Sequence, residues 1–102
     1  MKTRLQIQEI LEDILGSDKV YFQPPENFKL KYPCIVYDAG AGNRVPGDNK
    51  KYLFFQGYTV TYITKDPDKR EVYDKLMDLP YAQPERQYKA DGLYHWVCFI
   101  YF

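Results

Sequence analysis

Side chains that commonly carry out chemistry are scarce in this sequence of 102 residues, which contains one histidine and two cysteines. The histidine, His95, stands between Tyr94 and Trp96 with no carboxylate or cysteine at ligand spacing, which is typical of a structural or surface histidine. The cysteines, Cys34 and Cys98, lie in apolar stretches without CxxC spacing. This placement predicts buried thiols in a reducing compartment rather than a disulfide.

Charge of one sign is not in excess, because 14 basic residues balance 14 acidic ones. A domain that binds nucleic acid normally carries a basic excess, so the balance argues against a specific nucleic-acid partner. No apolar run approaches the roughly 20 residues that a membrane-spanning helix needs. The first residues never reach the apolar run of a signal peptide. We therefore expect no membrane association and no secretion signal.

Aromatic residues, by contrast, are abundant, at 18% of the chain with 11 tyrosines. A chain of 102 residues has room for one domain and one core, and a core of that size cannot bury so many rings. Tyrosine combines an apolar body with a polar tip and is enriched in protein interfaces. The composition favours a single domain over residues 1–102 that contacts other proteins, although dense packing of a small core would also use aromatic residues.

The apolar spacing of residues 3–15 predicts an amphipathic helix. Thr3 and Gln6 are three residues apart, as in a capping box, and Gly16 suits a left-handed C-cap. Asp66 and Pro67 predict the start of a second helix over about 67–77, with Asp66 as the N-cap. The stripe that this second helix buries is expected to contain Val72 and Leu76, joined by Tyr73 and Met77.

Residues 93–102 form the most aromatic and β-branched segment of the chain. Both alternating sets of side chains are largely apolar, so we expect a strand covered on both faces, or covered on one and engaged by a partner on the other. Asp91 and Gly92 suit a type I′ turn. The polar segment 86–90 is then the outer arm of a C-terminal hairpin, after a linker over 81–84.

Three further strands are predicted over 19–23, 34–37 and 57–64. The last of these has the clearest alternation, with Tyr58, Val60 and Tyr62 on one face, and residues 52–55 lead into it. Residues 38–51 hold three glycines and a proline, which predicts a long mobile loop between two strands. The predicted fold class is therefore α+β, in the order α-β-β-β-α-β-β, with a mainly antiparallel sheet and both helices on one face.

Catalytic motifs are weak. Cys34 and His95 are a conceivable nucleophile and base, since strands bring distant residues together, but each lies in an apolar run without a glycine-rich elbow. The glycine-rich residues 40–47 lack the terminal Lys-Ser/Thr of a phosphate-binding loop, and no helix follows them. Aromatic residues interleave with lysines at 28–32 and 50–54, which leaves binding of single-stranded nucleic acid as a second class. We predict no enzyme activity, no cofactor and no metal.

Five segments, in the order in which they occur, resemble stretches of a known protein family. They are Val20-Tyr-Phe-Gln-Pro-Pro-Glu26, Leu30-Lys-Tyr-Pro-Cys-Ile-Val-Tyr37, Tyr58-Thr-Val-Thr-Tyr-Ile-Thr-Lys-Asp-Pro-Asp68, Lys75-Leu-Met-Asp-Leu-Pro-Tyr81 and Ala90-Asp-Gly-Leu-Tyr-His-Trp-Val97. The chain is similar to the tail-terminator or tail-completion proteins encoded in the head–tail joining gene clusters of long-tailed phages and prophages. The resemblance covers nearly the whole chain and carries no catalytic signature.

The resemblance implies a non-enzymatic structural protein of the virion with an α+β fold of this same element order, located in the tail or neck and assembled in the cytoplasm of the bacterial host. Such proteins form oligomeric rings, typically hexamers, that cap the finished tail tube and provide the docking surface for the head. The partners implied are further copies of the chain, the tail-tube protein and a head-completion or connector protein. The alternatives are a head-closure or adaptor protein on the portal side of the neck and, from a different class, a small domain that binds single-stranded nucleic acid.

No motif marks the residues that would contact these partners. Loop 38–51 is the natural segment to reach a neighbouring subunit, and tyrosines with apolar bodies and wet tips suit contacts made late in assembly. The predicted interface residues are Asn43, Arg44, Val45, Lys50, Lys51, Tyr52, Tyr58 and Tyr62.

Overall fold

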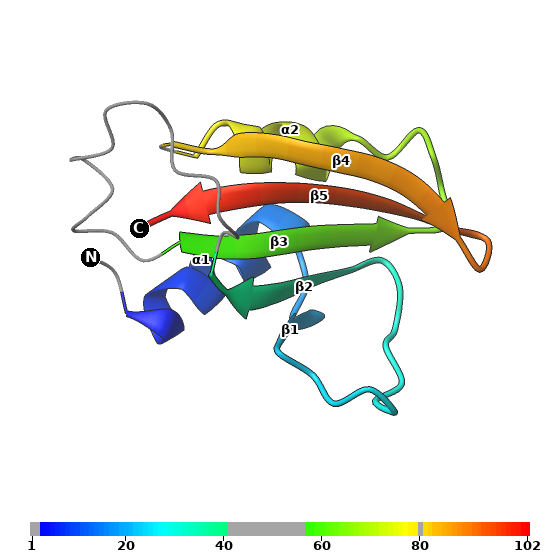
Figure 1. Ribbon diagram of the computed structural model, residues 1–102, viewed down its shortest axis with the longest axis horizontal. Coiled ribbons are helices and arrows are strands. Elements are labelled where there is room, and N and C mark those ends of the chain that lie inside the picture. Colours follow the sequence, from blue (N-terminus) through cyan, green and yellow to red (C-terminus); the bar gives the residue numbers. More distant parts are fainter. Residues whose placement is uncertain (1–2, 41–56, 80) are drawn as a thin grey trace.

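The computed structural model describes residues 3–40, 57–79 and 81–102. They form an α+β domain in the predicted order of elements (Figure 1). The predicted fold class and order are confirmed. The elements are α1 (Arg4–Leu15), β1 (Val20–Phe22), β2 (Cys34–Ala39), β3 (Gly57–Thr64), α2 (Glu71–Met77), β4 (Gln83–Ala90) and β5 (Leu93–Tyr101).

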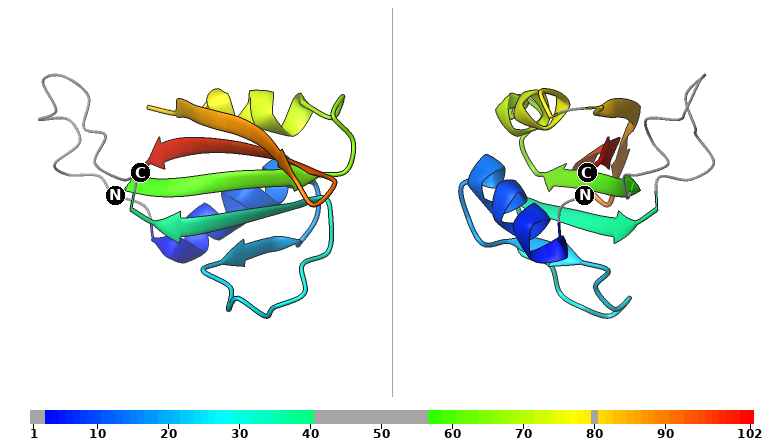
Figure 2. Two further views of the ribbon diagram at one scale, coloured as in Figure 1. Left: turned by 45° about the vertical axis from the view of Figure 1, so that its right-hand side comes forward. Right: turned by 90° about the vertical axis from the view of Figure 1, so that its left-hand side faces the viewer.

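The sheet has five strands in the order β1-β2-β3-β5-β4. The short strand β1 runs parallel to β2, and the other neighbouring pairs are antiparallel. Both helices lie on the same face of this sheet, as the end-on view of Figure 2 shows. The C-terminal strand β5 is central, between β3 and β4, so the sheet is complete only when this last strand is in place.

Helix α1 has the ends that its sequence predicts. The backbone N–H of Thr3 donates to Oε1 of Gln6 over 2.9 Å, and the N–H of Gln6 donates to Oγ1 of Thr3 over 3.3 Å. These two bonds make the capping box, which satisfies backbone groups that have no partner inside the helix. Gly16 ends the helix in the left-handed region, with φ 80°, and its N–H donates to the carbonyl of Glu12.

Helix α2 begins later than predicted, at Glu71 rather than Pro67, so the assignment of Asp66 as its N-cap is wrong. The Asp66 carboxylate accepts instead from the N–H of Asp68 over 2.9 Å, and the Asp66 carbonyl accepts from the N–H of Lys69. Aspartate followed by proline favours a tight turn as strongly as a helix start. Here the turn forms, and the helix follows it. Its buried residues are Tyr73 and Leu76.

Strand bounds differ from the predictions at three places. Strand β1 is shorter than 19–23, and β2 continues through Asp38 and Ala39, which the sequence had placed in the loop. Strand β4 begins at Gln83 and includes Pro84, where a linker was predicted. Proline is tolerated there because β4 is an edge strand, and the register shifts between Pro84 and Arg86. Residues 52–55, which were expected to lead into β3, and the part of the predicted loop 38–51 after Gly40 lie outside the described residues.

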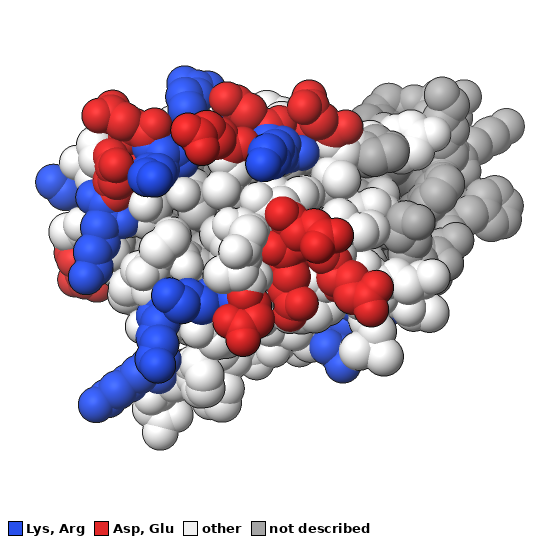
Figure 3. Space-filling view, turned by 180° about the vertical axis from the view of Figure 1, so that it is seen from behind, with Lys and Arg blue, Asp and Glu red and all other residues white. Residues whose placement is uncertain are grey.

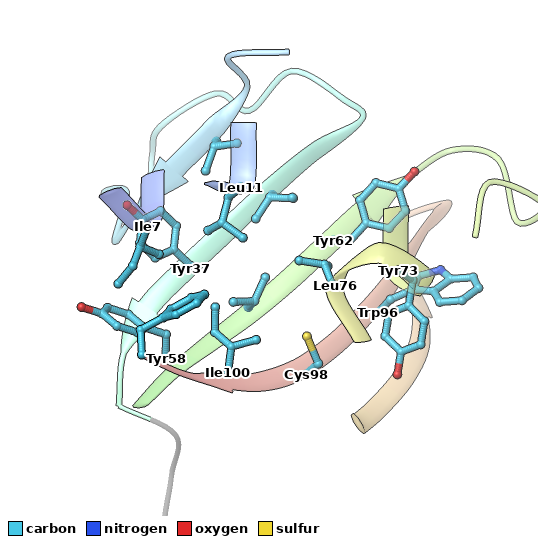
Figure 4. Packing of buried hydrophobic residues seen from close by; sticks show 14 residues of the cluster. Ile7, Leu11, Tyr37, Tyr58, Tyr62, Tyr73, Leu76, Trp96, Cys98 and Ile100 are labelled. Atoms are coloured by element: carbon cyan, nitrogen blue, oxygen red, sulfur yellow. The ribbon is translucent and has the colours of Figure 1, made fainter. Parts of the chain in front are cut away.

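One hydrophobic cluster fills the space between the helices and the sheet (Figure 4). The predicted alternation of β3 is confirmed, because Tyr58, Val60 and Tyr62 all belong to this cluster. Alternate residues of β5 join them from the neighbouring strand. The cluster consists of Ile7, Leu11, Val20, Ile35, Tyr37, Tyr58, Val60, Tyr62, Tyr73, Leu76, Trp96, Cys98, Ile100 and Phe102.

A small polar network fastens α1 to the sheet at the edge of the core. The Tyr37 hydroxyl, on β2, donates to Oε1 of Gln8 over 2.6 Å. The Gln8 amide then donates to the carbonyl of Val20 and to the Glu12 carboxylate, each over 2.9 Å. The phenol and the amide therefore enter the core region with their polar atoms paired, as burial of such groups requires.

The turn between β4 and β5 is expected to be sensitive to one substitution. Asp91 and Gly92 have φ of 54° and 75°, as a type I′ turn needs. Gly92→Ala is expected to lower the free energy of unfolding by about 1 kcal/mol, because a side chain is strained in this backbone conformation. Steric clash adds nothing to this loss, since a Cβ at this position meets no atom within 4 Å. Urea denaturation would measure it. Gly92→Asn is the control, with a smaller loss, and equal losses would contradict backbone strain as the cause.

Candidate interaction surfaces

Six of the eight predicted interface residues lie outside the described residues, so the structure says nothing of them. They are Asn43, Arg44, Val45, Lys50, Lys51 and Tyr52. The other two, Tyr58 and Tyr62, have exposed fractions of 6% and 1% and point toward the helices. This burial disagrees with the prediction that the two tyrosines form part of an interface. The apolar face of β3 on which they lie could have covered either the core or a partner, and in the structure it covers the core.

The conceivable pair of Cys34 and His95 lies on one face of the sheet but is too widely spaced for catalysis. Cys34 pairs with Ile63, and Ile63 pairs with His95, so the two residues are two strands apart. Two strand spacings are about 10 Å, whereas a nucleophile and its base need hydrogen-bond contact. Burial also raises the pKa of the Cys34 thiol to about 12.

The described residues contain neither a cluster of metal ligands nor a membrane-spanning helix. No group of three histidine, cysteine or acidic residues among the described ranges could hold a metal ion. No helix within residues 3–40, 57–79 and 81–102 is long and apolar enough to cross a membrane.

An aromatic stack lies on the sheet face opposite the helices. The rings of Tyr88 and His95 are parallel within 7°, with centroids 4.5 Å apart. The Arg86 guanidinium lies 5.0 Å from the centre of the Tyr88 ring. Tyr88 pairs with His95 on β5, and Arg86 pairs with its near neighbour Val97. Successive residues of a strand face opposite sides of the sheet, and Trp96 faces the core, so these side chains point away from the core. We call Arg86, Tyr88 and His95 the aromatic stack. Tyr88 is 41% exposed.

The outer edge of β4 is poorly suited to adding another strand. Pro84 provides no donor, and the shift of register between Pro84 and Arg86 breaks the regular ladder. Lys89 places a charge on the same strand, where it is exposed. Proline, bulges and lysine are the features by which natural proteins protect sheet edges from pairing. A partner is therefore expected to contact the side chains of β4 rather than to pair with its backbone.

A groove runs between the two helices on the other side of the molecule. Its floor is apolar, formed by Ile10, Ile14 and Leu79, which are half-buried. Its walls carry the charged side chains of Asp13, Lys75 and Asp78, and its volume is about 340 Å³. We call this feature the interhelical groove.

A third surface feature is the connection between β1 and β2. Phe28 is 46% exposed, and its ring lies 5.2 Å from that of Tyr21, at a tilt of 59°. Lys29 and Lys31 beside it are also exposed, and Leu30 is half-buried. We call Phe28-Lys-Leu-Lys31 the basic segment. An exposed ring held by a second ring and flanked by like charges is a typical anchor for a partner.

Sequence patterns gave partial signals for these features. The interleaving of aromatic residues and lysines marked the basic segment, although as a weak sign of nucleic-acid binding. The alternation of β5 placed His95 and Trp96 on different faces but did not indicate which face covers the core. Neither the groove nor the contact of Tyr88 with His95 was visible, because both depend on how elements pack against each other.

Comparison of the chain with protein-family models, with curated proteins and with solved structures finds no match.

Proposed function

We propose that this chain is a structural subunit of a phage tail, forming a ring, typically a hexamer, that caps the tail tube and joins it to the head connector. The proposal rests on the resemblance of several ordered segments to tail-terminator proteins. It is supported by the α+β fold and the element order that this resemblance implied. Both are properties of the whole domain, and neither depends on a single motif.

The observation that carries the proposal is the aromatic stack on a sheet face that bears no helix among the described residues (Figure 2). Tyrosine and arginine are the residues most enriched at the energetic centres of protein interfaces. In Tyr88 and Arg86 they are held in place by ring contacts, so little side-chain entropy is lost when a partner binds. The stack therefore suits contact with the tail tube or the connector.

Native mass spectrometry of the chain, with and without purified tail tubes, tests this function. We expect a ring in at least one condition, with rings on tube ends in negative-stain images. Tyr88→Ala is expected to weaken tube binding by roughly tenfold or more, because it removes the centre of the stack. Tyr81→Ala is the matched control, since Tyr81 is 38% exposed and lies outside the stack, and it should bind tubes normally.

Other outcomes would assign the chain elsewhere. A chain that stays monomeric and ignores tubes, yet binds a purified head connector, would be a head-closure or adaptor protein on the portal side of the neck. A chain that binds neither would contradict any role in the neck.

A second candidate function uses the same stack. An exposed ring on a sheet, with an arginine beside it, can stack against an unpaired base. If the chain is a single-strand binding domain, short oligonucleotides should bind with an affinity that falls steeply with salt, and Tyr88→Ala should abolish the binding. Binding to tubes without binding to oligonucleotides would reject this candidate.

A further inference from the structure

We propose that copies of this chain meet head to tail, with the basic segment of one copy docked in the interhelical groove of the next. This inference deepens the proposed function, because it rests on the chain forming a ring and names the surfaces by which the subunits touch. The occupant of the groove is a second copy of the chain, and the ring of Phe28 is the anchor that enters it.

The groove is a shallow, open depression, and its polarity suits such an anchor. Its apolar floor of Ile10, Ile14 and Leu79 lies between charged walls, and a pocket with an apolar floor and a charged rim is typical of the centre of an interface. A volume of about 340 Å³ leaves room for an aromatic ring. Ile10, Ile14 and Leu79 pack against the core with part of their surface left exposed, and a partner's ring would bury that remaining part.

The charge around the groove is predominantly negative. Among the described residues that line it, Asp13 and Asp78 stand against one cation, Lys75, and Glu9 and Glu12 lie on the same helix as Asp13. Acidic side chains gather over this helix in the space-filling view of the helical face (Figure 3). A partner with positive charge and an apolar side chain would complement this surface best.

The basic segment provides that combination. Phe28 exposes nearly half of its surface, and Lys29 and Lys31 lie one and three residues after it. Within residues 24–37 one acid, Glu26, stands against the two lysines, so the segment keeps a net positive charge. With the Phe28 ring on the groove floor, the two ammonium groups can reach the carboxylates of Asp13 and Asp78.

The two surfaces are different parts of the molecule, because the basic segment follows the edge strand β1, whereas the groove lies between the two helices. Phe28 packs on Tyr21, and Tyr21 alternates with Val20 and Phe22, whose side chains belong to or pack against the core beneath the helices. The connection accordingly projects away from the helices in the end-on view of Figure 2. Contact between two different surfaces is heterologous, and repetition of such a contact closes a ring or extends a filament.

Charge reversal tests the contact on the full-length chain. Lys29→Glu with Lys31→Glu gives a first variant, and Asp13→Lys with Asp78→Lys gives a second. All four positions are exposed, and lysine is favourable near the ends of both helices, where Asp13 and Asp78 stand. Circular dichroism should show both variants folded. Each variant alone places like charges across the contact and should self-associate roughly tenfold more weakly than the original chain.

An equimolar mixture of the two variants is the decisive measurement. In alternating order, every contact then joins glutamates to lysines or lysines to aspartates, so native mass should show rings again, with equal numbers of the two variants. Restoration in the mixture requires two different complementary surfaces, which a general loss of stability cannot imitate.

Phe28→Ala should weaken assembly without unfolding the chain, since the ring is 46% exposed. Leu5→Ala is the matched control, because Leu5 is 66% exposed and belongs to neither surface. It should assemble like the original chain.

The outcomes separate this contact from the function on which it rests. If the original chain forms rings and both charge-reversed variants form them equally well, the contact is wrong and the ring function stands. If the variants fail alone and also fail when mixed, the contact is again wrong. If the original chain stays monomeric with tubes present, the ring function fails, and the contact fails with it.

Discussion

Replacing Ile100 with alanine is expected to lower the free energy of unfolding by about 3 kcal/mol, within the range of large-to-small changes in a core. Ile100 is fully buried on the central strand β5 and lies opposite Tyr58 of β3. Figure 4 places it in the middle of the cluster, between Tyr58 and Cys98. A cavity there loses contacts on several sides, and the surrounding strands cannot collapse to fill it.

Urea or thermal denaturation, followed by circular dichroism, would measure this effect. For a domain of this size the midpoint of thermal unfolding should fall by more than roughly 10 °C. Leu5→Ala serves again as the control, because a residue that is 66% exposed should change stability by no more than about 0.5 kcal/mol. A similar loss from both substitutions would mean that Ile100 is not part of a tightly packed core.

The two cysteine thiols are expected to react with a thiol reagent roughly a thousandfold more slowly in the folded protein than in the unfolded one. Burial raises the pKa of Cys34 and of Cys98 from 9.0 to about 12. Near neutral pH the fraction of each thiol present as the reactive thiolate therefore falls by roughly a thousandfold. Both side chains are also closed to solvent. Absorbance of released thionitrobenzoate, with and without urea, measures the rates.

The raised pKa values also predict a loss of stability in alkali. Between pH 9 and 12 the unfolded thiols lose their protons while the folded thiols keep them, so the unfolded state binds fewer protons and stability falls as pH rises through this window. Burial raises the pKa of Tyr37, Tyr62 and Tyr73 as well, which adds to the same trend. Constant stability from pH 8 to 11, or fast labelling of the folded protein, would contradict burial of these groups.

Prediction of the candidate surfaces from sequence succeeded least, for a reason that the tyrosines illustrate. Tyr58 and Tyr62 were expected at an interface because of their residue type, yet they lie in the core, whereas Tyr88 on a polar outer strand is exposed and stacked on His95. Residue type does not distinguish these cases. The face that each tyrosine occupies depends on where the helices pack, and this is decided by all the elements together.

The sequence by itself determined the local structure of this protein. The capping box of Thr3 and Gln6, the left-handed Gly16, the alternation of β3 and the Asp91–Gly92 turn all follow from interactions among residues close in the chain. Local steric preferences and hydrogen bonds dominate such features, so short patterns predict them.

Only the tertiary structure decided which surfaces are available to partners. The interhelical groove joins residues 10–14 to residues 75–79, and the aromatic stack joins β4 to β5 by their register. The start of α2 also depended on context, since the same Asp-Pro pair suits a turn or a helix. These features follow from the burial of apolar surface across the whole domain. That burial depends on many contacts between residues distant in the sequence, so no short sequence pattern predicts it.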